Sequence, residues 1–174
     1  AWVKQIDQHL EAGNFQRAGE VADKALSERP DDAELLELRK LVAQGAERAS
    51  RADELTAEGE ALCAQGRADE GVALLEKALQ LDERSVARIT LRDVFVSRAQ
   101  DSVDQDWRAA EALADRALAL DPGHALAKSL RAEALDKKRE ELIDQCASKA
   151  RRLQAAGDFE AAAAEVQRVL ALYP

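Results

Sequence analysis

Residues 105–122 read QDWRAAEALADRALALDP, and this stretch decides the fold of the chain. An aromatic residue, Trp107, is followed after three and ten positions by Ala110 and Ala117. Residues at this spacing lie along one face of a helix, and alanine is small enough to let a second helix approach closely. Pro122 lacks an amide hydrogen and cannot continue the helix. The stretch therefore predicts a short helix that packs closely against a neighbour and is ended by proline.

The same pattern occurs three more times along the chain. It reads GNFQRAGEVADKALSERP at residues 13–30, GRADEGVALLEKALQLDE at residues 66–83 and GDFEAAAAEVQRVLALYP at residues 157–174. The glycine that opens each of these copies predicts a left-handed turn at the end of the preceding helix. Phe15 and Phe159 correspond to Trp107, and we expect each aromatic residue to anchor its helix against the preceding one. Trp107 is expected to be largely buried against a helix over residues 84–101.

These repeated segments resemble the second half of the tetratricopeptide repeat, a motif of two helices with the signature Trp, Leu, Gly, Tyr/Phe, Ala, Phe, Ala and Pro. Trp2 and Ile6, and again Leu55 and Gly59, fall at positions of the first-helix signature. The resemblance implies an all-α solenoid whose first helices line a concave surface for a protein or peptide partner. Positions that face this groove in the family fall here on Asp7, Leu10, Glu60, Arg92, Phe95, Ala99 and Arg151.

The spacing of the copies departs from the family and predicts two long helices. The four turn positions are separated by 53, 39 and 52 residues, against about 34 residues in the family. The additional residues lie in segments 31–65 and 123–156, which contain no internal proline. Because both segments are also rich in helix-forming residues, each is expected to form one continuous helix.

A shift of 92 residues aligns Phe15 with Trp107 and Pro30 with Pro122, and a shift of 91 residues aligns Gly66 with Gly157. Residues 1–83 and 92–174 therefore predict an internal duplication. We therefore expect a single domain over residues 1–174, built as an α-solenoid of about eight helices. The centres of the two long helices are polar, reading ERASRADE at residues 47–54 and DKKREE at residues 136–141. Six successive charged residues cannot be buried on any face of a helix. Such a centre is either a solvated bridge between two packed ends or a contact surface for another subunit.

Composition excludes several classes of partner. Charged residues make up 34% of the chain, whose formal net charge of −9 is carried by residues 1–83. This charge repels a phosphate backbone, so we expect no nucleic-acid partner. No run of 18 apolar residues occurs, so we expect no membrane contact from this segment. The chain begins Ala-Trp and contains no methionine, so we expect it to be a piece of a longer protein. Cys63 and Cys146 are expected to be small core residues of a cytoplasmic protein.

Residue types that perform catalysis form no recognisable site in the sequence. His9 and His124 are the only histidines, and neither has a nucleophile or a carboxylate at a catalytic spacing. The phosphate loop, the dinucleotide fingerprint and the His-Glu-x-x-His zinc motif are all missing from the sequence. The sequence therefore predicts a protein that is not an enzyme and that holds neither a cofactor nor a metal.

Four arginines suggest where a partner binds. Arg84, Arg88, Arg92 and Arg98 lie on the predicted helix 84–101 beside the aromatic Phe95. This basic stripe is either a peptide site or a set of intramolecular partners for the acidic first half, in which case Phe95 packs inside.

We expect a protein-interaction scaffold, and the alternative is self-association of the long helices into a homo-oligomer. The long-helix style of the repeat is similar to the repeat tails of bacterial Ser/Thr kinases, which implies a regulatory tail as the setting.

Overall fold

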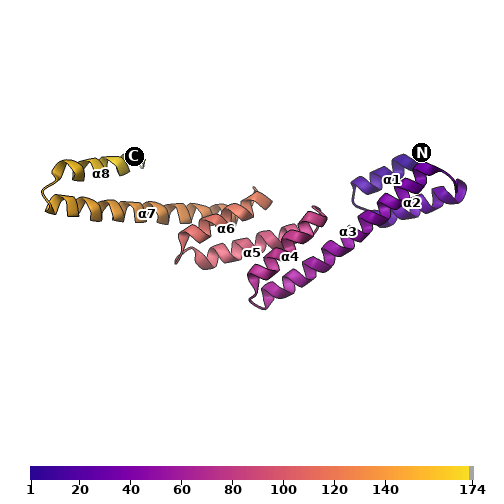
Figure 1. Cartoon of the computed structure of the whole chain (residues 1–174), viewed down its shortest axis with the longest axis horizontal. Coiled ribbons are helices and arrows are strands. Elements are labelled where there is room, and N and C mark those ends of the chain that lie inside the picture. The colour runs from indigo at the N-terminus through magenta and orange to yellow at the C-terminus, as the bar shows by residue number, and fades with distance from the viewer. Residues whose placement is uncertain (173–174) are drawn as a thin grey trace. The chain divides into compact units, whose positions relative to one another are not determined.

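The computed structural model of the chain describes residues 1–172. These residues form α-helices and turns without a β-strand, which confirms the predicted all-α fold (Figure 1). The described part contains eight helices: α1 (Trp2–Glu11), α2 (Phe15–Glu28), α3 (Ala33–Ala64), α4 (Ala68–Leu81), α5 (Ala87–Ser102), α6 (Trp107–Leu120), α7 (Ala125–Ala155) and α8 (Phe159–Leu172).

The chain divides into two compact units. Unit 1 is Ala1–Val94 and contains α1 to α4 with the beginning of α5, and unit 2 is Phe95–Pro174. Each unit is built around one long helix with a short helix packed on either end, α2 and α4 on α3 and then α6 and α8 on α7 (Figure 1). The sequence halves at 1–83 and 92–174 remain a prediction.

Both long helices run without a break through their polar centres, as the absence of proline predicts. Helix α3 is continuous through residues 47–54, and α7 is continuous through residues 136–141. Each begins with a side chain that caps its free amide hydrogens. Asp32 Oδ1 accepts from the amides of residues 34 and 35, and His124 Nδ1 accepts from the amide of Ala127 at 3.2 Å. The side chain of His124 therefore acts as a helix cap.

The turns between helices follow the sequence pattern. Gly13, Gly66 and Gly157 adopt φ values of 70°, 81° and 81°, the left-handed conformation that only glycine takes at no steric cost. Just after two of these turns, Asn14 and Asp158 accept hydrogen bonds from backbone amides in the first turn of the next helix. A residue that ends one helix and a residue that starts the next thus stand side by side in the sequence.

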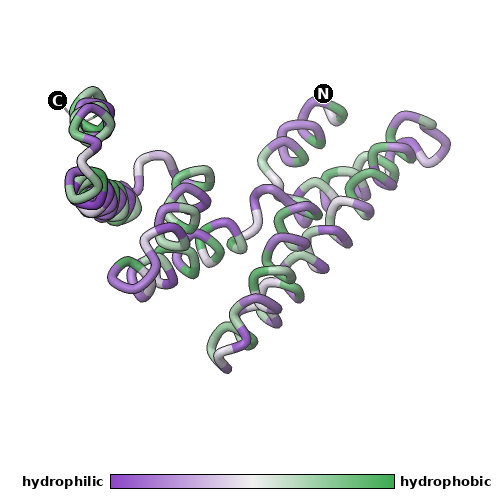
Figure 2. The backbone as a smooth tube through the Cα atoms, turned by 60° about the vertical axis from the view of Figure 1, so that its left-hand side comes forward, coloured by the Kyte–Doolittle hydropathy of each residue, from purple (hydrophilic) through white to green (hydrophobic). Residues whose placement is uncertain are grey.

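The core of unit 1 lies where α1, α2 and α3 meet. Small alanines of α2 pack against larger aliphatic side chains of the other two helices, and the fully enclosed cluster consists of Ile6, Ala18, Ala22, Ala25, Leu35 and Val42. Phe15, at the start of α2, lies against Gly45 of α3, where a Cβ atom would collide with its ring. Figure 2 shows hydrophobic and hydrophilic residues alternating along the helices, as expected for helices with one packed face.

Unit 2 differs from unit 1 in the centre of its long helix. No described side chain of α7 between Ala134 and Cys146 is buried, whereas α3 buries Gly45 and Ala52 near its centre. In the charged stretch 136–141, none of the six side chains is buried, and Asp136, Arg139 and Glu140 are exposed. Helices α6 and α8 pack on the two ends of α7 (Figure 1).

Candidate functional site

The residues predicted to line a binding groove fall into two classes by exposure. Glu60 and Arg151 are exposed, and Asp7, Leu10 and Arg92 are partly exposed. All five are therefore accessible to a partner, four of them in unit 1 and Arg151 in unit 2.

Phe95 and Ala99 are buried, so the prediction that they face a groove is wrong. Their side chains are 2% and 0% exposed. The guanidinium of Arg116 lies 4.0 Å from the centre of the Phe95 ring, as in a cation–π contact. A partner cannot reach either side chain without displacing this packing. Of the two interpretations of Phe95, the structure supports the one in which the ring packs inside.

The first arginine of the predicted stripe, Arg84, does not lie on the same helix as the others. Helix α5 begins at Ala87, so Arg84 lies in the turn before it, and its Nη1 donates to the carbonyl of Leu10 at 3.3 Å. This cation sits at the carboxyl end of α1, where a positive charge is favourable. Arg92 forms an ion pair of 2.7 Å with its neighbour Asp93. Intramolecular contacts thus account for part of the stripe.

Glu60 is the predicted groove residue with the clearest link between helices. Its Oε1 accepts a hydrogen bond of 2.8 Å from Thr90 Oγ1, which joins α3 to the first part of α5. A second pair of hydroxyls, Thr56 and Ser85, lies 3.2 Å apart nearby and is buried. The helix that follows α4 is therefore held to α3 by polar contacts.

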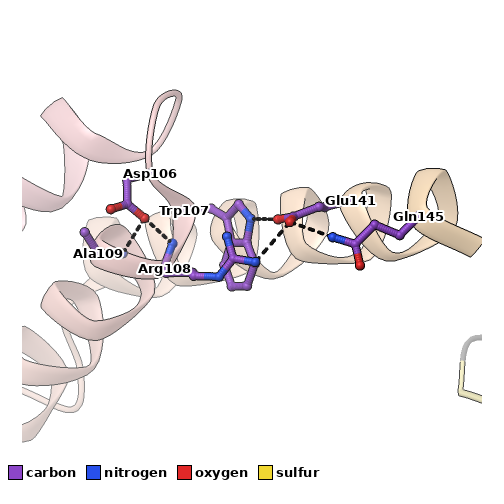
Figure 3. A network of polar contacts seen from close by, with 6 residues as sticks. All are labelled: Asp106, Trp107, Arg108, Ala109, Glu141 and Gln145. Atoms are coloured by element: carbon purple, nitrogen blue, oxygen red, sulfur yellow. Dashed lines mark hydrogen bonds and ion pairs between the residues drawn. The ribbon is translucent and has the colours of Figure 1, made fainter.

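Trp107 is partly buried, and its indole lies in a polar network on α7, the helix that follows its own (Figure 3). Its Nε1 donates to Glu141 Oε2 at 2.6 Å, and Arg108 Nη2 donates to the other carboxylate oxygen at 3.0 Å. Gln145 adds a third hydrogen bond to Glu141. The indole is thus fixed against the helix that follows its own.

Electrostatics strengthen this network. The hydrogen bond from Arg108, and after it the one from Trp107, lowers the pKa of Glu141 from its ordinary value. Arg108 stacks 4.1 Å from the indole centre, and Lys138 lies 5.5 Å from it. Because the participants belong to α6 and α7 only, this network acts as a clasp between two helices.

One ion pair occurs twice in the chain with the same atoms. In unit 1, Arg39 Nε lies 2.5 Å from Asp23 Oδ1, and in unit 2, Arg131 Nε lies 2.7 Å from Asp115 Oδ1. Both residues of the second pair stand 92 positions after those of the first. Helices α2 and α3 are thus joined in the same way as α6 and α7.

Phe159 is 67% exposed, which contradicts its predicted role as an anchor against the preceding helix. Phe15 and Trp107 explain the error, because both contact the helix that follows their own. No helix follows α8 within the described residues. Val166 and Leu170 of α8 are also exposed, at 41% and 59%. Sequence reasoning missed these two, although their spacing from Phe159 places them on its helix face.

Helix α8 is nevertheless held firmly on α7 by Glu165, which is only 9% exposed. Its carboxylate accepts from Arg168 at 2.7 Å and from Lys149 of α7 at 2.8 Å. These hydrogen bonds lower the pKa of Glu165 to about 2, with the Arg168 bond contributing most. Glu165 is therefore ionised at neutral pH and links the two helices.

Neither Cys63 nor Cys146 is part of a disulfide; Cys146 is buried, as expected for a core residue, and Cys63 is partly buried. Within residues 1–172, acidic, histidine and cysteine side chains form no group able to hold a metal ion. None of the described helices is both long and apolar enough to cross a membrane. No model of a known protein family matches this chain, and no curated protein matches it either.

Proposed function

We propose that this chain is a tetratricopeptide-like helical-repeat scaffold that binds a protein or peptide partner. One observation carries the proposal, namely the recurrence of a single helix-pair contact 92 residues apart. Asp23–Arg39 and Asp115–Arg131 join a short helix to the start of a long one in each unit. An internal duplication accounts for this recurrence, and stacked duplicated helix pairs form the extended binding surfaces of solenoid proteins.

The proposed partner surface of unit 1 consists of Asp7 and Leu10 on α1, Glu60 on α3 and Arg92 on α5. These side chains are accessible, and they combine acidic, apolar and basic chemistry. Arginine contributes strongly to many protein interfaces. In unit 2, Arg151 is the corresponding exposed residue on α7. A regulatory tail of a bacterial Ser/Thr kinase is the setting we propose for the scaffold, in the cytoplasm, where free thiols are maintained.

Affinity capture from cells tests this function. The parent chain, the double variant Glu60→Ala/Arg92→Ala and a control, Glu58→Ala, are immobilised and exposed to the same extract. Glu58 is exposed on α3 two positions before Glu60 and therefore points to a different side. We expect a partner whose recovery falls about tenfold with the double variant and is unchanged with the control. Equal recovery by all three chains rejects this surface.

A second candidate function is self-association through the long helices. It is favoured by Leu135 and Ile143, apolar side chains of α7 that are 39% and 47% exposed next to a solvated centre. Exposed apolar side chains on such a helix are suited to contact with a copy of itself. Sedimentation equilibrium over a hundredfold concentration range separates the two functions, because a scaffold for other proteins remains a monomer throughout.

A further inference from the structure

The two long helices begin with equivalent cap residues of different chemistry. Asp32 caps α3 and His124 caps α7, and the two positions are separated by 92 residues, the same shift as the recurring ion pair. Their backbones match, because φ and ψ are −75° and 108° at Asp32 and −65° and 109° at His124. The duplicated position thus holds a carboxylate in unit 1 and an imidazole in unit 2.

Both side chains accept hydrogen bonds from the first turn of their helix. Asp32 Oδ1 lies 3.2 Å and 3.3 Å from the amide nitrogens of Glu34 and Leu35. His124 Nδ1 lies 3.2 Å from the amide nitrogen of Ala127, which corresponds to Leu35 at the shift of 92 residues. Such an acceptor stabilises the start of a helix, because the first amides have no carbonyl partner within the helix.

The imidazole of His124 can accept this hydrogen bond only while Nδ1 carries no proton. A neutral imidazole has one nitrogen that accepts, whereas a protonated imidazole donates from both. Protonation therefore removes the cap, and it also places a positive charge at the amino end of α7, where the helix dipole disfavours it. Histidine changes its charge between about pH 5 and pH 8, whereas a carboxylate such as that of Asp32 remains charged over this range.

The other charged groups where α6 meets α7 do not titrate in this range. They lie on the last two turns of α6, in the connecting turn and on the first two turns of α7, namely Asp115, Arg116, Asp121, Lys128 and Arg131. Aspartate titrates below about pH 5, and lysine and arginine titrate above about pH 8. Asp121 also holds the turn, since its Oδ1 accepts from the amide of Gly123 at 3.0 Å. A response of the α7 start within this range therefore belongs to His124.

The start of α7 is the part of the helix that holds α6. Ala127 and Leu130 are 0% and 4% exposed, and Arg131 Nε lies 2.7 Å from Asp115 Oδ1 of α6. All three α7 residues lie within the first two turns after the cap. Loss of the cap therefore acts directly on the contact between α6 and α7.

We propose that His124 is a pH-sensitive helix cap, which holds the start of α7 on α6 while its imidazole is neutral and loosens this contact when it gains a proton below neutral pH. Unit 1 lacks the response, because Asp32 performs the same task with a carboxylate. The proposal concerns a conformational change within unit 2 and does not depend on the partner proposed for the scaffold.

Amide hydrogen exchange of the full chain from about pH 8 to about pH 5 tests the proposal. The measured quantity is the protection factor, which corrects each rate for the intrinsic pH dependence of amide exchange. We expect protection at residues 129–133 of the parent to fall about fivefold as the pH is lowered, the effect of losing one helix cap. The equivalent amides at residues 37–41 of α3 should keep their protection.

Three variants assign the effect to the cap. His124→Asp gives α7 the cap of unit 1 and should make its protection constant over this range, as should the uncharged cap in His124→Asn if the first variant does not fold. Asp32→His should transfer the pH dependence to the start of α3. His9→Gln removes the other histidine of the chain, in the last turn of α1, and should leave the response of α7 unchanged.

Proton–nitrogen correlation spectra of the imidazole show directly when Nδ1 of His124 gains its proton. The fall in protection should coincide with this event. The proposal is overturned by constant protection of the α7 start in the parent, by an unchanged response in both position-124 variants, by an equal fall at the start of α3 in the parent, or by a fall that does not coincide with protonation of His124.

Discussion

Gly59 of α3 and Gly71 of α4 bring the two helix backbones into direct contact. A Cβ atom at Gly71 would lie 2.6 Å from the carbonyl oxygen of Gly59, and it would also collide with the sulfur of Cys63. Neither obstacle is easily moved, since one is backbone and the other is partly buried. At a shift of 91 residues, which aligns Gly66 with Gly157, the corresponding residues of unit 2 are Ala150 and Ala162.

This contact predicts opposite effects for two glycine substitutions in helices. Gly71→Ala should destabilise unit 1 by about 1–3 kcal/mol, as expected for overpacking. Gly19→Ala should stabilise it by up to about 1 kcal/mol, because alanine favours a helix and the new Cβ atom meets only an ordinary contact. Urea denaturation followed by circular dichroism measures both. A stabilising Gly71→Ala would show that α3 and α4 are not this close.

The aromatic residues of α2 and α8 should differ in their effect on stability. Phe15→Ala should lower the free energy of unfolding by about 1–3 kcal/mol, because the ring lies against Gly45. Phe159→Ala should change it by less than about 0.5 kcal/mol, because the ring is 67% exposed. Thermal unfolding of the two variants beside the parent gives the comparison. Equal losses would mean that α8 is covered in solution.

The clasp between α6 and α7 depends on Glu141. Glu141→Ala should lower the melting temperature of unit 2, because Trp107 and Arg108 both lose their acceptor. The neighbouring Glu140→Ala is the control, since Glu140 is exposed and outside the network (Figure 3). Tryptophan emission should also shift as the indole loses its hydrogen bond. Matching melting curves for the two variants would rule out the clasp.

Acid should loosen α8 through Glu165. Its pKa is lowered to about 2 in the folded chain, whereas the unfolded value lies near 4.5. A depressed pKa contributes stability that is fully present above pH 4.5 and is lost as the pH falls from 4.5 toward 2. Amide exchange in α8 should therefore accelerate over this range in the parent. Glu165→Gln should lack this pH dependence, and the exposed Glu160→Gln should retain it.

Much of the fold was predictable because it depends on local chemistry. Helices α3 and α7 follow from the lack of proline in segments 31–65 and 123–156, and the turns at Gly13 and Gly157 follow from the conformational freedom of glycine. These features require no knowledge of which helices are neighbours. The recurrence at a shift of 92 residues is likewise visible in the sequence alone.

The candidate site was harder to predict because exposure depends on neighbours. Phe15, Trp107 and Phe159 occupy equivalent sequence positions. Phe15 and Trp107 contact the helix that follows their own, whereas Phe159 is exposed. Phe95 and Ala99 occupy groove positions of the family but are buried here. A position that faces the groove in the family is exposed in this chain only where neighbouring helices pack as they do in the family.

Hydrogen–deuterium exchange of the chain, free and bound to the partner recovered by affinity capture, tests the central claim most directly. The scaffold account predicts slower exchange in the segments of α1, α3 and α5 that carry Asp7, Glu60 and Arg92, and little change at residues 135–145 of α7. Protection confined to residues 135–145, and present without any partner at high protein concentration, would contradict it and establish self-association of the long helices instead.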